Sequence, residues 1–171
     1  MRLQLDLFTS PIGEIRLVTT DEGALAALDF TNYEARNLAL LRRHWGDAEL
    51  VEGAAPRAVT QALTAYFDGD LAAIDALAVK TNGTAFQEAA WAALRAIPAG
   101  ATRSYAQQAV AIGKPRAMRA VGLANGANPV AIVTPCHRVI GADGGLTGYG
   151  GGLPRKRWLL EHEGALVRLA A

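Results

Sequence analysis

The first thirty residues alternate apolar and polar side chains with a period of two. Leucine occupies every second position in 3–7, Ile15 and Leu17 resume the alternation after a Ser-Pro-Ile-Gly turn sequence, and residues 24–30 repeat it after Asp-Glu-Gly. Because alternate residues of a strand share one face, this pattern predicts a β-meander of three strands.

Helical spacing of apolar residues replaces the alternation in the next two segments. It predicts one helix over residues 33–45 and a second helix after Pro56. Residues 70–83 show neither period and end in Thr-Asn-Gly, which is typical of a loop. We therefore expect two domains, 1–80 and 81–171, with the first formed by a small sheet and its helices.

The second domain carries mostly helical signals. Thr84 with Gln87, and Ser104 with Gln107, have the three-residue spacing of a capping box at a helix start. Pro115 suits a first helical position and predicts the start of a further helix. The last two of these helices have the proportions of a helix-turn-helix unit, which is a weak indication of DNA binding by itself.

Composition excludes several classes of protein. The chain has 171 residues, of which 51% are hydrophobic and 19% charged, so it can bury a core and is not disordered. It contains no apolar run long enough to span a membrane, and its first residues are unlike a signal peptide. Its one cysteine, Cys136, rules out an internal disulfide and a zinc site with several thiolates. We expect a cytoplasmic protein without membrane contact and without a bound metal.

The two predicted domains differ in charge. Residues 1–80 carry 7 basic and 12 acidic side chains, whereas residues 81–171 carry 10 basic and 4 acidic side chains. The net charges are therefore −5 and +6, although the whole chain has a net charge of only +1. A basic half is the electrostatic pattern of a protein that binds a phosphate backbone.

The candidate chemistry lies around the single cysteine. Residues 130–133 are apolar and predict a short buried strand that leads into Pro135 and Cys136. An isolated cysteine is usually an inert small hydrophobic residue, but His137 and Arg138 follow this one and favour its thiolate. Neighbours on a strand point to opposite faces, so contact between Cys136 and His137 requires a turn after Pro135 or a bridging water.

Three stretches of the second domain resemble the O6-alkylguanine-DNA alkyltransferase family. They read FQEAAWAALRAIPAGATRSYAQQA, IGKPRAMRAVGLANGANPVAIVTPCHRVIG and LTGYGGGLPRKRWLLEHEG, and together they cover residues 86–164 almost without a gap. PCHRV with an upstream RAVG and Asn-Pro is the most specific part, and residues 1–80 match more loosely, chiefly through SPIG. The resemblance implies an α/β (α+β) fold. It has a ribonuclease H-like N-terminal domain and a mostly helical C-terminal domain with the helix-turn-helix and the active cysteine.

The resemblance also implies a function in direct reversal of DNA damage. Such a protein binds double-stranded DNA containing O6-alkylguanine, and O4-alkylthymine as well, from the minor groove. It flips the damaged base out of the duplex and transfers the alkyl group irreversibly to its own cysteine, once per molecule. No cofactor and no protein partner are needed, and a monomer is expected.

The catalytic roles are carried over by position. Cys136 matches the acceptor, His137 matches the base that takes the thiol proton through a water, and Glu163 matches the acid that orients the histidine. Asn128 matches the asparagine that ties the recognition helix to the active-site segment. Without the resemblance, Glu163 would be interpreted as an exposed acid at a helix end.

The remaining roles concern the flipped base and the DNA. The implied base pocket is lined by Tyr105, Val139 through its carbonyl, Tyr149 and Gly150. In the implied DNA-binding helix an arginine fills the space of the extruded base, and small residues permit close approach to the groove. Arg119 matches this arginine, Ala117 and Gly122 are among the small residues, and Arg116 is a second basic residue of the same predicted helix.

Two alternatives use the same residues differently. A thiol hydrolase would have to release the group from its cysteine after each reaction. This is disfavoured because alkylated cysteine is a thioether, which, unlike a thioester, is not readily hydrolysed. A lesion-sensing protein of the same fold would lack the acceptor, usually having tryptophan there, and Cys136 argues against it. Ala131 and Gly150 stand where some members have proline and serine, so the tolerated adduct size is left open. Thr134 replaces the usual aliphatic residue before Pro-Cys, and its effect on the nucleophile is a separate open point.

Overall fold

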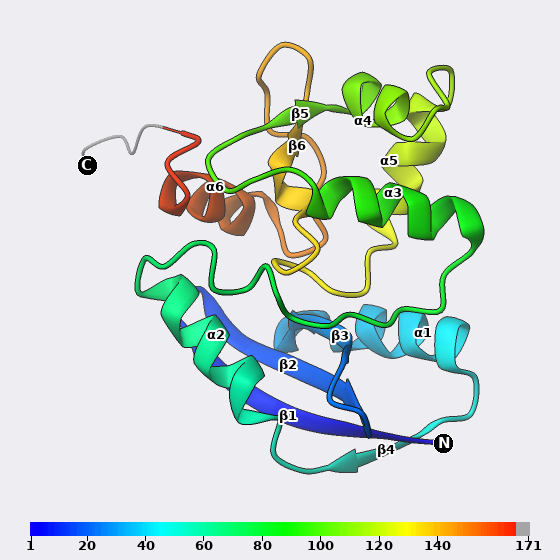
Figure 1. Ribbon diagram of the computed structural model, residues 1–171, viewed down its shortest axis with the longest axis vertical. Coiled ribbons are helices and arrows are strands. Elements are labelled where there is room, and N and C mark those ends of the chain that lie inside the picture. Colours follow the sequence, from blue (N-terminus) through cyan, green and yellow to red (C-terminus); the bar gives the residue numbers. More distant parts are fainter. Residues whose placement is uncertain (167–171) are drawn as a thin grey trace. The chain divides into compact units, whose positions relative to one another are not determined.

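The computed structural model describes residues 1–166, which form two compact units (Figure 1). Unit 1 comprises Met1–Gly83 with Pro129–Val133, and unit 2 comprises Thr84–Asn128 with the chain from Thr134 onward. The division into domains 1–80 and 81–171 remains a prediction, and it did not anticipate that residues 129–133 group with unit 1. Within the described residues, no helix has the length and apolar character needed to cross a bilayer.

Unit 1 is built on a four-stranded sheet. Its strands are β1 (Arg2–Ser10), β2 (Gly13–Thr20), β3 (Leu25–Phe30) and β4 (Glu49–Glu52). The order is β3-β2-β1-β4, with antiparallel pairs in the meander and a parallel pair between β1 and β4. The predicted meander is confirmed, whereas β4 was missed because four residues are too few for a clear alternation.

Two helices and a short 3-10 turn, η1 (Thr31–Tyr33), complete unit 1. The helix α1 (Glu34–Trp45) packs through Leu41 and Trp45 against the sheet, and α2 (Arg57–Phe67) follows Pro56 as predicted. The predicted link 70–83 is not a free connection, because β3 pairs with it through bonds from Leu25 N to Ala78 O and from Lys80 N to Leu25 O.

Unit 2 contains the four remaining helices, α3 (Ala85–Arg95), α4 (Tyr105–Ala111), α5 (Met118–Gly126) and α6 (Leu153–His162). Both predicted capping boxes are present, at Thr84 with Gln87 and at Ser104 with Gln107. In each of them the first side chain accepts a backbone N–H and the glutamine side chain returns a bond, so the helix starts are fixed locally.

The predicted helix start at Pro115 is wrong. Residues 114–117 form a turn, closed by a bond from Ala117 N to Lys114 O of 2.8 Å, and α5 begins only at Met118. The fixed backbone angle of proline suits a turn as well as a first helical position, so the pattern did not distinguish them. Arg116 and Ala117 therefore precede α5 and do not lie on it.

A small parallel pair of strands holds the site residues of unit 2 together. It joins β5 (Arg103–Ser104) to β6 (Val139–Ile140). The 3-10 turn η2 (Cys136–Arg138) runs directly into β6, and α4 starts directly after β5. The pairing therefore fixes the cysteine turn relative to the first residue of α4.

The predicted strand over residues 130–133 is also wrong. Only Val130 pairs, with Leu28, and Ile132 then takes a positive φ of 69° at the centre of a γ-turn closed by Val133 N to Ala131 O. A positive φ is unusual for a β-branched residue and marks local strain. The apolar run indicated burial correctly, but burial does not determine backbone conformation.

A second tight turn delivers the cysteine. Pro135 has φ −83° and ψ 69°, the angles of an inverse γ-turn, and Cys136 N donates to Thr134 O over 2.9 Å. The chain thus turns after Pro135 into η2, which is the local geometry that sequence analysis required for contact between neighbouring site residues.

Candidate active site

Cys136 lies at the start of η2 and is half-buried. The side-chain amide of Asn128 donates to Thr134 O over 2.8 Å and approaches the Cys136 sulfur at 3.3 Å. Asn128 therefore fixes the turn before the cysteine and also places an N–H donor at its sulfur. Such a donor stabilises negative charge on sulfur, which is the charge of a nucleophilic thiolate.

A fully buried ion cluster stands behind the cysteine. His137 Nε2 and Glu163 Oε1 are 2.8 Å apart, and the Arg138 guanidinium donates to both carboxylate oxygens at 2.9 and 2.8 Å. Arg138 also donates to Ile97 O, at the end of α3. All three side chains are at most 4% exposed. Glu163 is thus not an exposed acid, and the charge of Arg138 is matched by Glu163 rather than directed at the thiol.

The charge states of this cluster follow from its contacts. Burial alone would raise the pKa of Glu163, but its interactions with His137 and Arg138 outweigh burial and place that pKa well below its ordinary value. Burial lowers the pKa of His137, more than the neighbouring carboxylate raises it. The histidine is therefore neutral beside an ionised carboxylate.

The neutral histidine has one tautomer that fits its partners. Nε2 must carry the proton, because it faces an ionised carboxylate, and Nδ1 is then an acceptor. Nδ1 is buried and has no hydrogen-bond partner among residues 1–166. His137 can therefore take a proton at Nδ1 while Glu163 stabilises the resulting imidazolium.

Lys156 is a second buried cation of the site, and it is fully buried. Its ammonium donates to the carbonyls of Val139, Thr147 and Gly148 at 2.7, 2.8 and 3.2 Å. It thereby ties β6 to the loop before α6. Burial lowers the pKa of Lys156 to about 8, and the opposite charge of the Cys136 thiolate partly counteracts this.

A pocket of about 140 Å³ opens beside the cysteine. Of the predicted residues, Tyr105, Tyr149 and Gly150 line it together with Cys136 and Gly122. The Tyr105 hydroxyl donates to Thr147 O over 3.1 Å, so a hydrogen bond joins the start of α4 to the loop that Lys156 holds. The Val139 side chain is fully buried and its carbonyl accepts from Lys156.

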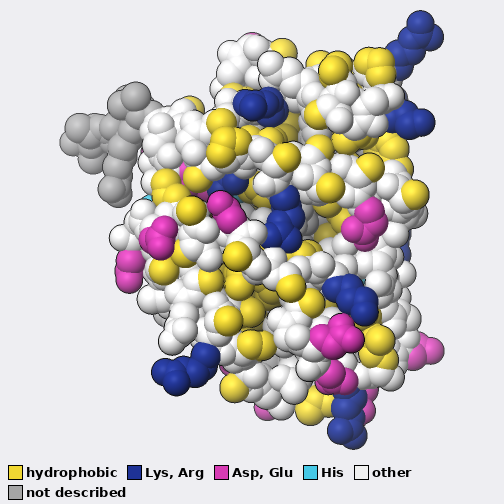
Figure 2. Space-filling model, viewed as in Figure 1, with side chains coloured by type: hydrophobic (Ala, Val, Ile, Leu, Met, Phe, Trp, Pro, Cys, Tyr) yellow, Lys and Arg dark blue, Asp and Glu magenta, His cyan; other side chains and the backbone are white. Residues whose placement is uncertain are grey.

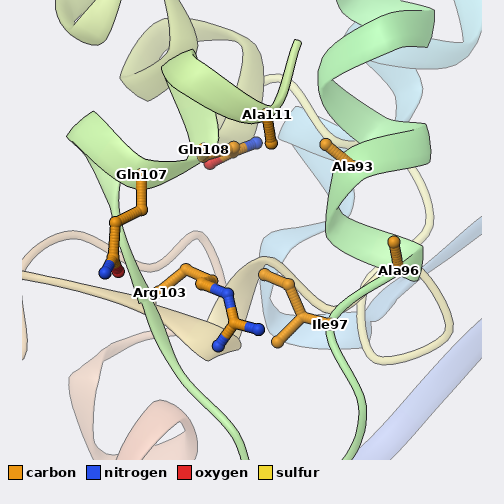
Figure 3. Close-up of a pocket in the computed structure, with 7 residues that line it drawn as sticks. All are labelled: Ala93, Ala96, Ile97, Arg103, Gln107, Gln108 and Ala111. Atoms are coloured by element: carbon orange, nitrogen blue, oxygen red, sulfur yellow. The ribbon is translucent and has the colours of Figure 1, made fainter.

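A larger cavity of about 300 Å³ lies elsewhere, between α3 and α4 (Figure 3). Figure 3 shows the Arg103 side chain extending between Gln107 and Ile97. The remaining lining consists mostly of alanines, and Cys136 is not among the lining residues. Size alone would therefore select the wrong cavity, and the smaller pocket is the candidate reaction site.

The predicted DNA-binding residues lie outside this pocket, with the exception of Gly122. Lys114, Arg116 and Arg119 are exposed, and they occupy the turn before α5 and its first helical turn. Figure 2 shows Lys and Arg side chains projecting at the end of unit 2 where α4 leads into this turn. Ala117 and Gly122 are partly exposed, so small residues and cations share the surface of the helix-turn-helix.

Four residues of the site have roles that the sequence analysis did not predict. They are Arg138 as the partner of Glu163, Lys156 as the buried cation, and the amide pair Gln108 and Asn125. Each of these residues bonds to a partner that is far away in the sequence. The one signal that the sequence offers is a polar residue at a position where the helical pattern predicts an apolar one. In the described part of the chain, no three His, Cys, Asp or Glu side chains converge to hold a metal ion.

Comparison with known families covers nearly the whole chain. A family model described as "6-O-methylguanine DNA methyltransferase, DNA binding domain" matches residues 85–165. A second, described as "6-O-methylguanine DNA methyltransferase, ribonuclease-like domain", matches residues 5–81. These matches and the structure confirm the predicted fold class.

Individual relatives agree with the family models. A methylated-DNA-protein-cysteine methyltransferase of Salmonella typhimurium is 46% identical over 169 residues, covering 98% of this chain and 99% of the relative. One from Mycobacterium bovis is 57% identical over 122 residues, 71% of either chain. Among solved structures, Mycobacterium tuberculosis OGT in complex with DNA superposes with a TM-score of 0.80 and 41% identity, covering 95% of this chain and 93% of that chain.

Proposed function

Because the chain belongs to the 6-O-methylguanine DNA methyltransferase family, we propose that it repairs DNA by transferring the methyl group of O6-methylguanine to Cys136. One observation carries the assignment of the acceptor. The only cysteine of the chain lines a pocket, receives an N–H from Asn128 and stands in front of a buried histidine-carboxylate pair. These are the parts of an activated nucleophile.

The proposed reaction moves one methyl group and one proton. His137 takes the thiol proton at Nδ1 through one water, and the thiolate attacks the methyl carbon in line with the C–O6 bond. A C–S bond forms while the C–O6 bond breaks, and its electron pair stays on the base. The proton taken from the thiol then passes to the guanine, which restores the neutral base. Charge that gathers on the leaving base is stabilised by the Gly150 N–H and by the Tyr105 hydroxyl, which turns from Thr147 O to the base.

The product explains why one molecule acts once. A thioether is not readily hydrolysed, so the methylated cysteine is a dead end, and a thiol hydrolase on the same residues is disfavoured. O4-alkylthymine presents the same alkyl-oxygen bond and is the second proposed substrate. The expected monomeric state and cytoplasmic location remain predictions.

DNA is the proposed macromolecular partner, approached through α5 and the turn before it. The exposed cations Lys114, Arg116 and Arg119 supply phosphate contacts and one side chain for the stack, while the small residues allow entry into the minor groove. Extruding a base costs a few kcal/mol, and an inserted side chain offsets part of the lost stacking.

The decisive experiment measures the intact mass of the protein before and after incubation with excess duplex containing O6-methylguanine. The expected result is a gain of one methyl group per molecule, located on Cys136 by peptide mapping. Repeated demethylation without a mass gain would contradict the proposal and identify the protein as a hydrolase. Tight binding without any demethylation would replace it by a lesion sensor.

Replacing Arg119 by alanine is expected to reduce extrusion of the base more than affinity for the duplex. Arg119 is one of several exposed cations, so its loss removes only a minor share of the attraction to phosphates. It removes completely the side chain that is proposed to fill the space of the extruded base. A fluorescent base analogue opposite the lesion reports extrusion, and anisotropy reports affinity. Arg116→Ala is the matched control, and an equal loss of extrusion in both variants would contradict the role of Arg119.

The transfer rate is expected to fall as the pH rises through about 8, where the buried Lys156 loses its charge. A neutral amine has two N–H groups for three carbonyls and no longer attracts the Cys136 thiolate. Stability should change in the opposite direction. The pKa of Lys156 is about 8 in the folded chain and 10.5 ordinarily. Between these two pH values the unfolded chain binds more protons than the folded chain, so the free energy of unfolding rises with pH over this range.

Single-turnover rates and thermal unfolding measured on both sides of pH 8 check this behaviour. Lys156→Met should abolish the descending limb of the rate profile, while the matched control Arg157→Met, which changes an exposed neighbour on α6, should keep it. A descending limb that survives in Lys156→Met would assign the titration to another group.

A further inference from the structure

The pocket wall that α5 contributes contains a buried amide. Asn125 lines the pocket together with Cys136, between the two glycines Gly122 and Gly126 of the same helix. Asn125 is buried, with only 9% of its surface exposed. The neighbouring glycines present no side chain, so Asn125 supplies the chemistry of this wall.

The orientation of this amide is fixed by a second one. Gln108 Nε2 donates to Asn125 Oδ1 over 2.8 Å, and Asn125 Nδ2 donates to Gln108 Oε1 over 2.7 Å. Gln108 also donates to Ala90 O on α3, and it is 2% exposed. Turning over either amide alone would oppose two N–H groups and two oxygens, so the pair holds a single arrangement.

Counting donors leaves one N–H of Asn125 for the pocket. A primary amide has two N–H groups, and a reciprocal pair uses the one on the same side as its oxygen. The other points away from Gln108, and no residue in the described range 1–166 accepts it. Asn125 lines the pocket, so its second N–H is the candidate hydrogen-bond donor of the wall beside the cysteine.

We propose that Asn125, positioned by Gln108, is a specificity-determining residue that selects among transferred alkyl groups by polarity. An alkyl group with an acceptor oxygen at its end bonds to the second N–H of Asn125. An apolar group of the same size covers that N–H and leaves it unsatisfied, which is unfavourable in a buried site. This proposal rests on the proposed alkyl transfer to Cys136.

The test compares two adducts of equal size on the unaltered protein, in duplexes containing O6-(2-hydroxyethyl)guanine or O6-propylguanine. The transfer rate is expected to be about tenfold higher for the hydroxyethyl group, equivalent to about 1.4 kcal/mol at 25 °C. The same ratio measured with a free thiolate and the modified nucleosides gives the intrinsic difference in reactivity. Methyl transfer to Cys136, measured first by intact mass, tests the function itself, so failure of the function and failure of the selectivity are distinguishable.

The double variant Gln108→Met with Asn125→Leu replaces both amides by apolar side chains of similar size and leaves no amide unpaired. Its hydroxyethyl-to-propyl ratio should fall about tenfold, to the free-thiolate value, and a ratio of two rates cancels any loss of activity that both alkyl groups share. Val110→Met is the matched control, because Val110 is exposed on the same helix and lies outside this pocket. The proposal is overturned if the unaltered protein shows only the free-thiolate ratio, a result that does not require the variant to fold. An unchanged ratio in a folded double variant would overturn it as well.

Discussion

Cys136→Ser is expected to show no detectable methyl transfer and to keep its affinity for duplex DNA containing O6-methylguanine. A serine hydroxyl is far less acidic than a thiol and its oxygen is a weaker nucleophile towards a methyl carbon, so the Asn128 donor and His137 cannot compensate. The substitution replaces one sulfur atom by oxygen at a half-buried position. It leaves the exposed cations before α5, the proposed DNA contacts, unchanged. Intact mass checks transfer, and fluorescence anisotropy checks binding.

The outcome separates acceptor from scaffold. A mass gain in Cys136→Ser would place the acceptor on another side chain, because the chain has no second cysteine. Loss of affinity together with a lowered melting temperature would instead show that the turn at η2 had been damaged. Thermal unfolding of the variant therefore accompanies both measurements.

Local signals predicted the elements whose causes are local. The capping residues Thr84 and Ser104 fix helix starts through partners three residues away, and the alternation before residue 30 needs only a few neighbours. The errors arose where a local pattern allows two outcomes. Pro115 suits a turn or a helix start, and the apolar run before Thr134 suits a strand or buried turns.

The candidate site divides in the same way. Cys136 and His137 stand out because they are adjacent in sequence, whereas Glu163 was identified through the family resemblance alone. Its bonds to His137 and Arg138 span 26 and 25 residues, and no local pattern encodes such a distance. The same holds for Lys156, whose carbonyl partner Val139 lies 17 residues away.

Glu163→Gln is expected to slow methyl transfer about a hundredfold or more, the usual scale of general acid-base catalysis. In either orientation the amide nitrogen of glutamine opposes N–H groups of the Arg138 guanidinium, and in the orientation that replaces Oε1 it also faces Nε2 of His137. In that orientation the amide donates to Nε2 and the histidine proton moves to Nδ1, which can then no longer accept the thiol proton. Single-turnover rates at saturating DNA measure this loss apart from binding.

The same substitution tests the cluster as a structural element. Leaving Arg138 buried without a carboxylate should lower the free energy of unfolding by about 3 to 5 kcal/mol at neutral pH. Glu161→Gln is the matched control in the last turn of α6, since its contact with the half-exposed Arg157 is 3.9 Å long and its loss should change stability by less than about 1 kcal/mol.

The pH dependence of this stability difference distinguishes a charge effect from a packing effect. The pKa of Glu163 is depressed in the folded chain, so its contribution is complete above the ordinary carboxyl value of 4.5 and is lost as the pH falls towards the folded value. The melting temperatures of the unaltered protein and Glu163→Gln should therefore converge in acid, whereas Glu161→Gln should track the unaltered protein throughout. A gap that stays constant from neutral to acidic pH would mean that Glu163 supports the site by its shape and not by its charge, and the assignment of the His137 tautomer would fall with it.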